Sequence, residues 1–271
     1  MSRSASGGLR WMAVGYAVLA FLLLPTLLVV PMSFGRNPYL EFPPTGFTLQ
    51  WYEAYFIDRG WMSATLFSAR IAILVALLST AIGTLASLAL VRGRLRGRAG
   101  LQLLIISPVI IPTVAIAIAA FLFFARLQMI GSLLAFVLAH TVLAVPYVVL
   151  TVSAALTRVD ADLDLAAMGL GASRAEAFVR VTLPLILPGV LSGAVFAFII
   201  SFDEAVVSFF LSGVHDKTLP RLMFENIELR LTPTIAAVST LLTALSLVAL
   251  SLVLLLGRLG RLGRRKDRPI D

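Results

Sequence analysis

The chain has 271 residues, of which 59% are hydrophobic and only 13% are charged. Soluble domains carry about 25% charged residues, so this composition argues against a soluble protein and favours one embedded in a membrane. Cysteine is absent, which excludes disulfides and thiolate ligands, and the net charge of +8 comes from basic residues that flank apolar blocks, which favours a lipid surface over nucleic acid as the partner.

Long apolar blocks predict an all-helical, polytopic membrane protein that forms a single transmembrane domain over residues 1–271. A helix rises about 1.5 Å per residue, so about 20 apolar residues cross a hydrocarbon core of about 30 Å. The first block follows a basic N-terminus, as in a signal peptide, but it is long and lacks a small-residue cleavage site, so we interpret it as a retained span. The six expected spans are 11–33, 71–91, 101–124, 132–156, 183–212 and 232–257.

The positions of Lys and Arg predict the orientation of the chain. With the N-terminus in the cytoplasm, fifteen of the 22 basic residues fall on the cytoplasmic side and seven on the other. Cytoplasmic loops are enriched in Lys and Arg, and an even number of spans returns the C-terminus to the starting side. We therefore expect both termini and the connection 157–182 to be cytoplasmic. Arg70 is expected at the outer edge of the second span, where its stem can reach the interface.

Two of the outer connections are long enough to carry structure. The first, 34–62, contains an aromatic stretch that favours anchoring at the membrane–water interface, with a substrate-binding aromatic box as the alternative. The second, 213–230, has apolar residues at helical spacing with charges between them, which predicts a short amphipathic helix. The aromatic residues are Trp51, Tyr52, Tyr55, Phe56 and Trp61, and the apolar residues of the second connection are Leu219, Leu222, Met223 and Ile227.

The cytoplasmic connection 157–182 carries the most specific pattern. Asp160, Asp162 and Asp164 suit the start of a helix, where the helix dipole favours anions. Gly169 and Gly171 should interrupt that helix. A side chain at Gly171 would block either a left-handed turn or the close approach of another surface.

A second short helix should follow in the same connection. Ser173 and Glu176 have the spacing of a capping box, which predicts a helix beginning near Arg174. Pro184 disfavours helical geometry at Leu183, so we expect it to separate this helix from the fifth span. Two short helices that meet at a glycine turn make a compact knob, although a plain amphipathic connector would satisfy the same pattern.

These residues resemble a known motif, the "EAA" loop of ABC-importer permeases. In that family the loop forms a coupling helix that docks on the ATPase subunit. The family's glutamate before the two alanines is Leu165 in this sequence, with Asp164 one position earlier, so docking would use shape and apolar contact unless Asp164 substitutes. The matching residues are Ala166, Ala167, Gly171, Ala172, Ser173 and Phe178, followed by Leu183-Pro184 and Pro188-Gly189.

Further along, the sequence resembles permeases of the spermidine/putrescine group. The resemblance implies a bacterial inner-membrane subunit for a small, polyamine-like solute. It also implies a second, different permease subunit, two ATPase subunits and an extracytoplasmic solute-binding protein. The segments that carry it are Ser201-Phe-Asp-Glu204, Ser208-Phe-Phe-Leu-Ser-Gly213, Leu219-Pro220 and Pro233-Thr-Ile-Ala-Ala-Val-Ser-Thr240.

Residues that could carry chemistry are few. The sequence has no G-x-x-x-x-G-K-[ST] phosphate loop, so ATP, if it is used, is expected on a separate polypeptide, and this fits a permease and a secondary transporter equally. The resemblance implies that partner ATPase subunits use ATP and Mg²⁺ and that this chain binds no cofactor. Asp203 and Glu204 lie in the outer half of the fifth span, where carboxylates are costly and usually face a cavity or a partner. Either they attract a cation on the solute path or they serve packing. Adjacent helical residues point about 100° apart, so both should face one ligand only if the helix is broken there.

Two other classes of protein remain as alternatives. An ion-coupled secondary transporter could use Asp203 or Glu204 as its coupling carboxylate, but it would show inverted repeats, and none is visible. A membrane-embedded enzyme would need a cluster of nucleophile, base and metal ligands. His140 and His215 are isolated and have no metal-ligand spacing, and we expect His140 to hydrogen-bond a neighbouring helix.

Overall fold

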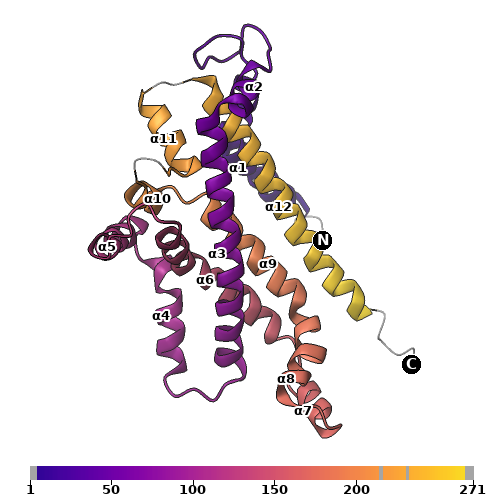
Figure 1. The fold of residues 1–271 in the computed structure, drawn as a ribbon. Coiled ribbons are helices and arrows are strands. Elements are labelled where there is room, and N and C mark those ends of the chain that lie inside the picture. The colour runs from indigo at the N-terminus through magenta and orange to yellow at the C-terminus, as the bar shows by residue number, and fades with distance from the viewer. Residues whose placement is uncertain (1–4, 214–215, 230–231, 266–271) are drawn as a thin grey trace. The chain divides into compact units, whose positions relative to one another are not determined.

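The computed structural model describes residues 5–213, 216–229 and 232–265, and their regular structure is helical apart from one isolated bridge between Gly35 and Phe47. His215, Arg230, Lys266 and Arg268 lie outside the described residues. The chain divides into two compact units, 1–62 with 223–245 and 63–222 with 246–271. Figure 1 labels the helices. They are α1 (Ala5–Met32), α2 (Gln50–Ile57), α3 (Arg59–Arg92), α4 (Arg98–Ile110), α5 (Thr113–Arg126), α6 (Leu133–Leu156), α7 (Asp162–Gly169), α8 (Arg174–Ala177), the π-helical turn η1 (Phe178–Thr182), α9 (Leu183–Phe202), α10 (Val206–Leu211), α11 (Leu219–Leu229) and α12 (Pro233–Arg265).

The described helices confirm a polytopic, all-helical membrane protein. Five of them are long and apolar enough to cross a bilayer, and the pair α4–α5 makes a sixth span if its two arms count as one. No residue of the qualifying window in α1 is buried, while 61% of that in α6 is buried. Because lipid tails are as apolar as leucine, exposure of α1 is no obstacle in a bilayer.

In the first unit, the connection between α1 and α2 is a loop closed by hydrogen bonds. Backbone bonds join Arg36 N–H to the Gly46 carbonyl at 3.1 Å and Thr48 N–H to the Phe34 carbonyl at 2.7 Å. At its tip, the carboxylate of Glu41 accepts hydrogen bonds from Asn37 and from the amide and hydroxyl of Thr45. The Thr45 hydroxyl, then its amide, then Asn37 lower the pKa of Glu41, which keeps it ionised at neutral pH.

Most residues of the predicted aromatic stretch make contacts within this unit. The Trp51 indole donates to the Gly35 carbonyl at 2.6 Å, and the Tyr52 hydroxyl lies 2.7 Å from the Ser33 hydroxyl. Tyr55 and Trp61 are buried, with their ring centroids 6.2 Å apart. These contacts close the loop onto α2. Only Phe56 among the five aromatic residues is exposed.

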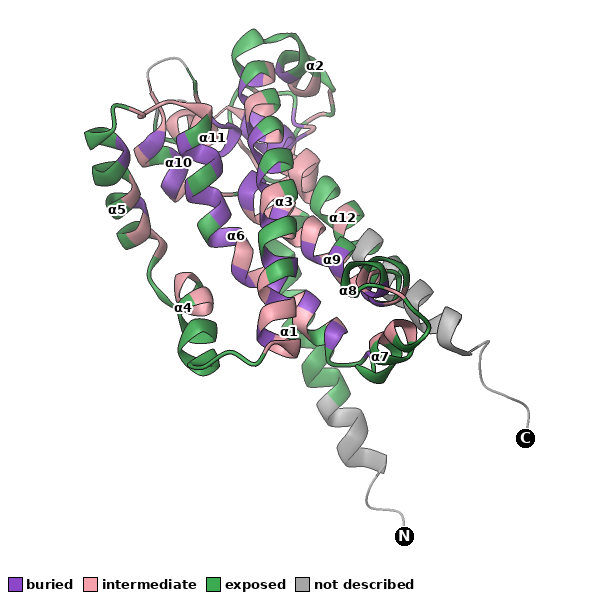
Figure 2. Ribbon diagram, turned by 60° about the horizontal axis from the view of Figure 1, so that its bottom comes forward, coloured by how far each residue is buried: buried purple, intermediate pink, exposed green. Residues whose placement is uncertain are grey.

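In the second unit, the core is built around α6. Thirteen of its residues are buried, and Figure 2 shows α6 largely buried while α4 and α7 are largely exposed. The core cluster draws on α3, α5, α6, α9 and α10. Its fully or almost fully buried members include Ile71, Val75, Phe136, Ala144, Val148, Val152, Leu156, Ile186, Ala197 and Leu211.

Glycines allow the backbones of α6 and its neighbours to approach closely. A Cβ at Gly189 would lie 2.5 Å from the Cβ of Ala155, and one at Gly193 would lie 2.7 Å from Oγ1 of Thr151. The two glycines are four residues apart, so they lie on one face of α9 against α6. Small residues at this spacing are a common device for packing helices in membranes, where no hydrophobic force drives the helices together.

The structure corrects several expected span boundaries. The helix of the second span begins at Arg59 and not at 71, and Arg70 lies on an exposed face inside α3. Its place at the outer edge of the span stays a prediction. The third span, expected as one helix over 101–124, is a pair of helices bent by 100°. The bend has a local cause, because Ile111 precedes Pro112 and takes an extended conformation with φ −72° and ψ 134°.

The fifth and sixth spans also differ from the expectation. The fifth, expected as one helix over 183–212, is broken after Phe202 and resumes as α10 at Val206. The last helix runs from Pro233 to Arg265, beyond the expected end at 257, and its span-like part is Pro233–Ser251. The short helix predicted within 213–230 is confirmed as α11. In the second unit, the start of α11 is held by a hydrogen bond of 2.8 Å from the Leu219 amide to the Ser68 hydroxyl.

The glycine contact between α9 and α6 predicts the effect of a larger side chain. Gly193→Val would force atoms into the Thr151 side chain and within 3.3 Å of Val148. We expect it to lower the free energy of unfolding by about 1–3 kcal/mol, the usual effect of overpacking. Thermal denaturation of the detergent-purified protein would measure this. Gly100→Val is the matched control, because no atom lies within 4 Å of a Cβ there, and equal loss in both variants would contradict the packing argument.

Candidate functional site

The segment between α6 and α9 folds as the two short helices that the sequence predicts. α7 ends at Gly169, and Gly171 follows with φ +95°. The Ala172 amide bonds to the Ala167 carbonyl at 3.1 Å, and the Gly171 amide bonds to the Met168 carbonyl at 3.0 Å. This pair of bonds is a Schellman motif, which needs a left-handed residue at the position of Gly171. No atom lies within 4 Å of a Cβ built on Gly171, so within the chain the requirement for glycine is one of backbone conformation.

The predicted capping box at the start of α8 is confirmed. The Ser173 hydroxyl accepts from the Glu176 amide at 3.3 Å, and the Glu176 carboxylate accepts from the Ser173 amide at 2.8 Å. The Ser173 amide, and then its hydroxyl, lower the pKa of Glu176 by bonding its charged form. The carboxylate is therefore ionised at neutral pH, and the cap fixes the direction in which α8 leaves the glycine turn.

Asp164 is held by the transmembrane part of the same unit. Its carboxylate forms an ion pair with Arg92, the last residue of α3, and accepts a hydrogen bond from the hydroxyl of the fully buried Thr182. Arg92 also donates to Thr182 at 2.9 Å. These three residues connect α7, α3 and η1. Sequence analysis did not identify Arg92 or Thr182, because the pairs span 72 and 90 positions and no local spacing indicates them.

Apolar side chains form the exposed surface of α7. Leu165 is 61% exposed and Leu170 is 91% exposed, while Leu163 and Ala166 are also exposed. Ala167 and Ala172 are half-buried beside them. Phe178, which the motif grouped with these residues, packs instead against the hydrophobic core. The structure therefore separates the predicted loop residues into an outer apolar set and an inner set that includes Asp164 and Phe178.

The connection to the fifth span is continuous, so the predicted separation at Pro184 is wrong. Leu183 has helical angles, φ −59° and ψ −45°, and its amide bonds to the Phe178 carbonyl five residues back. This wider π turn makes room for the proline ring, which has no N–H to donate. Residues Arg174–Phe202 consequently form one helical rod of 29 residues.

The break in the fifth span gives Asp203 and Glu204 different surroundings. The Glu204 carboxylate accepts hydrogen bonds from the amides of Val206 and Val207, at 2.8 and 3.0 Å, and so caps the start of α10. Asp203 is exposed, and its carboxylate has no hydrogen bond or ion pair with any described residue, although its backbone amide bonds to the Ile199 carbonyl at 3.0 Å. Asp203 is therefore the carboxylate at the break that has no partner among the described residues.

His140 bridges the two sides of this break from α6. It is only 1% exposed. Its Nδ1 lies 3.0 Å from the Ser201 hydroxyl and 3.2 Å from the Ser201 carbonyl, and its Nε2 lies 3.4 Å from the Ser208 hydroxyl. Ser201 belongs to α9 and Ser208 to α10, which confirms the expectation that His140 hydrogen-bonds a neighbouring helix. Among the described residues, no group of three His, Asp or Glu comes together as a metal site.

α5 lies beside α10, on the far side of the 100° bend (Figure 1). The rings of Phe121 and Phe210 join the two helices with centroids 6.4 Å apart. Irregular backbone is tolerated at membrane depth only where protein covers it or where it lines a cavity. The two breaks, at Ile111–Pro112 and at 203–205, therefore need either protein or a cavity beside them.

The fold is that of a polytopic helical membrane protein with a capped loop between two spans and a charged break in one of them. The chain belongs to the family of binding-protein-dependent transport system inner membrane components, whose family model matches residues 79–262.

Several characterised relatives are similar over most of their length. The putrescine transport system permease protein PotI of Escherichia coli K12 is 34% identical over 229 residues, which cover 82% of this chain and 81% of the relative. The spermidine/putrescine transport system permease protein PotC of Haemophilus influenzae is 33% identical over 230 residues, covering 84% and 88%. The molybdenum transport system permease protein ModB of Mycobacterium bovis is 35% identical over 201 residues, covering 67% and 76%.

Solved structures have the same fold. A bacterial ABC transporter involved in the import of the acidic polysaccharide alginate contains a chain that matches with a TM-score of 0.64 at 16% identity, covering 93% of this chain and 94% of that one. A second structure of a bacterial alginate ABC transporter, in complex with an alginate pentasaccharide-bound periplasmic protein, gives a TM-score of 0.65 at 16% identity, covering 97% and 96%.

The bridge formed by His140 predicts a specific loss of stability. His140→Ala would leave the buried hydroxyls of Ser201 and Ser208 without this partner, and we expect the free energy of unfolding to fall by about 1–2 kcal/mol. His140→Asn should recover part of the loss, because an amide can replace Nδ1. Thr141→Val is the control, since the Thr141 hydroxyl bonds only its own helix. Denaturation in detergent would measure all three, and an equal effect of Thr141→Val would contradict a bridging role.

Proposed function

We propose that this permease forms one half of the translocation path of an ATP-driven importer for small cationic amines. A second, different permease subunit would complete the path. An extracytoplasmic binding protein would deliver the solute, and two ATPase subunits would bind ATP and Mg²⁺. The missing phosphate loop supports a separate ATPase, and the family description supports a binding protein.

The outer surface of α7 is the proposed contact with the ATPase subunit. Leu165 and Leu170 offer exposed apolar area, and Ala166 beside them allows close approach. Asp164 is engaged by Arg92 and Thr182, which favours apolar contact over a charged contact through Asp164. In this proposal the ion pair between Asp164 and Arg92 also fixes the docking surface to the end of α3.

The proposed orientation places α7 and both termini in the cytoplasm of a bacterial cell. The support is the excess of basic residues on that side, fifteen of 22. The connections that precede α4 and α9 lie at the same end of the second unit, as alternating spans require (Figure 1). ATPase subunits are cytoplasmic, so a docking surface on α7 needs this orientation.

The observation that carries the solute assignment is the unpaired carboxylate of Asp203 at a break in a span. A carboxylate in a low-dielectric environment attracts a cation more strongly than one in water. A single acid also lets the solute leave, which a cage of several acids would hinder. PotI and PotC carry putrescine or spermidine in their names, and both are polyamines, whereas ModB is a molybdenum permease, so family membership alone leaves the solute open.

Removal of the charge at Asp203 tests the solute assignment. Asp203→Asn keeps the size of the side chain, and we expect about tenfold lower uptake of radiolabelled putrescine into proteoliposomes with the binding protein present. Glu204→Gln is the matched control, because a glutamine oxygen can still cap α10, and its uptake should change little. Unchanged uptake in Asp203→Asn would reject a need for its charge. Preference for a neutral or anionic solute would reject the cationic assignment.

Two glycines in one turn test the coupling role of α7. Gly171→Val places a β-branched residue at φ +95°, where it is a strong outlier, so the Schellman turn should be lost. We expect about tenfold or greater loss of solute-stimulated ATPase activity and uptake, with the permease still inserted. Gly169→Val adds the same side chain at the helical end of α7, where no atom lies within 4 Å, and should keep most activity. Full coupling in Gly171→Val would refute the assignment.

A further inference from the structure

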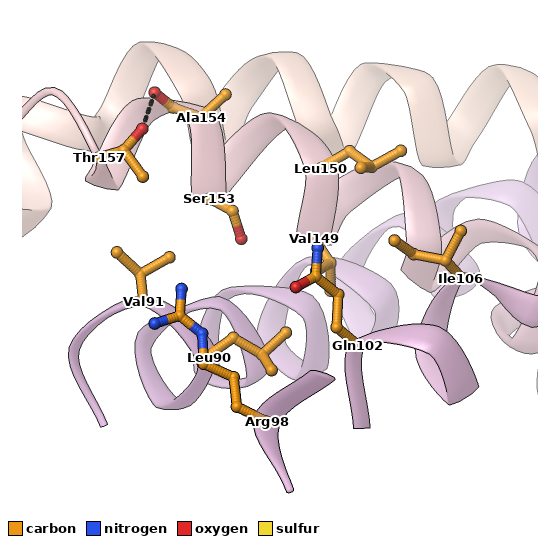
Figure 3. Close-up of a pocket in the computed structure, with 10 residues that line it drawn as sticks. All are labelled: Leu90, Val91, Arg98, Gln102, Ile106, Val149, Leu150, Ser153, Ala154 and Thr157. Atoms are coloured by element: carbon orange, nitrogen blue, oxygen red, sulfur yellow. Dashed lines mark hydrogen bonds between the residues drawn. The ribbon is translucent and has the colours of Figure 1, made fainter. Parts of the chain in front are cut away.

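A cavity of about 190 Å³ lies in the second unit, and no residue of α7 or of the break at 203–205 lines it. Figure 3 shows it between the end of α3, the first half of α4 and the second half of α6. This volume is below the range of about 300–1,000 Å³ that is usual for pockets of drug-sized ligands, so the cavity is suited to a small group. The lining residues are Leu90, Val91, Arg98, Gln102, Ile106, Val149, Leu150, Ser153, Ala154 and Thr157.

The cavity has a polar end and an apolar wall. Arg98 and Gln102 are four residues apart on α4 and reach into the cavity towards α6 (Figure 3). Ser153 of α6 faces them, while the hydroxyl of Thr157, just after α6, donates to the Ala154 carbonyl at 3.1 Å (Figure 3). Arg98 has no ion pair with a described residue, and no carboxylate lines the cavity. An arginine beside an amide and the Ser153 hydroxyl, with no acid, is suited to an anion such as a phosphate.

The surroundings of the cavity point to a lipid as the source of that anion. Leu103 and Leu104 of α4 are 63% and 69% exposed, and Leu150 at the cavity is 46% exposed. In a spanning bundle such surfaces contact acyl chains. Arg94 and Arg96 lie in the adjoining connection between α3 and α4, so the polar end marks the membrane–water boundary.

We propose that this cavity binds the headgroup of an anionic phospholipid. The Arg98 guanidinium pairs with the phosphate, Gln102 and Ser153 donate hydrogen bonds to its oxygens, and an acyl chain starts along Ile106 and Leu150. Basic pockets between spanning helices are suited to such headgroups. A cationic amine is repelled by Arg98, so the cavity is separate from the proposed solute path and does not depend on that proposal. The bound lipid fills the gap between α4 and α6.

Native mass spectrometry of the assembled transporter, titrated with phosphatidylglycerol or phosphatidylcholine, tests this site. We expect Arg98→Gln to weaken phosphatidylglycerol binding about tenfold, which is the effect of losing one charge-assisted contact. Arg96→Gln is the matched control, because it removes the same charge from the same end of the bundle but does not line the cavity. Ser153→Leu, which fills the cavity without changing charge, should also lose the lipid.

The outcomes distinguish a defined lipid site in the cavity from general attraction of anionic lipid to the basic connection between α3 and α4. Loss in Arg98→Gln and Ser153→Leu, with binding kept in Arg96→Gln and weak binding of phosphatidylcholine, supports the proposal. Equal loss in Arg98→Gln and Arg96→Gln would show attraction by the basic connection alone and overturn it. Unchanged binding in Arg98→Gln or Ser153→Leu would also overturn it. Displacement of the lipid by soluble glycerol phosphate at equal concentration would overturn the lipid assignment and leave only an anion site.

Discussion

The second unit depends on how closely α9 can approach α6. In a bilayer no water is released when two apolar helices meet, so their association relies on van der Waals contact and on polar bonds between them. Gly189 and Gly193 provide the contact by letting backbone and short side chains meet, where a Cβ would lie within 2.7 Å of α6. This fit makes α6 the buried axis of the unit and positions every element that α9 connects, from the capped loop at one end to the break at the other.

Polar bonds in this unit concentrate where helices end or break. The ion pair of Arg92 with Asp164 closes the loop onto α3, and His140 holds both sides of the interrupted fifth span. Glu204 caps α10. The Glu204 cap satisfies backbone amides that a continuous helix would satisfy internally, and irregular backbone at membrane depth needs such partners. Asp203 is the exception, and an uncompensated charge in such a place has a functional explanation more readily than a structural one.

Local sequence patterns predicted most of the helices and turns. The features that they did not predict depend on contacts between distant segments. The Ser173–Glu176 cap and the glycine turn could be predicted because both motifs lie within a few residues. Pro112 breaks its span as a proline should, yet the apolar run around it concealed the break. Pro184 has the same local preference, but the π turn before it absorbs the ring. The partner of Asp164 comes from another span, and no spacing in the sequence indicates it.

Because Arg174–Phe202 is one continuous helical rod, a tilt at one end displaces the other end. Its near end carries the Ser173 cap beside the exposed leucines of α7, and its far end stops at Asp203. Twenty-nine residues span about 40 Å, so a tilt of about 5° pivoting near one end displaces the other by about 3–4 Å. That displacement is comparable to the length of a hydrogen bond. In the proposed function, a small movement of the loop would therefore be enough to make or break a direct contact between Asp203 and an ammonium group.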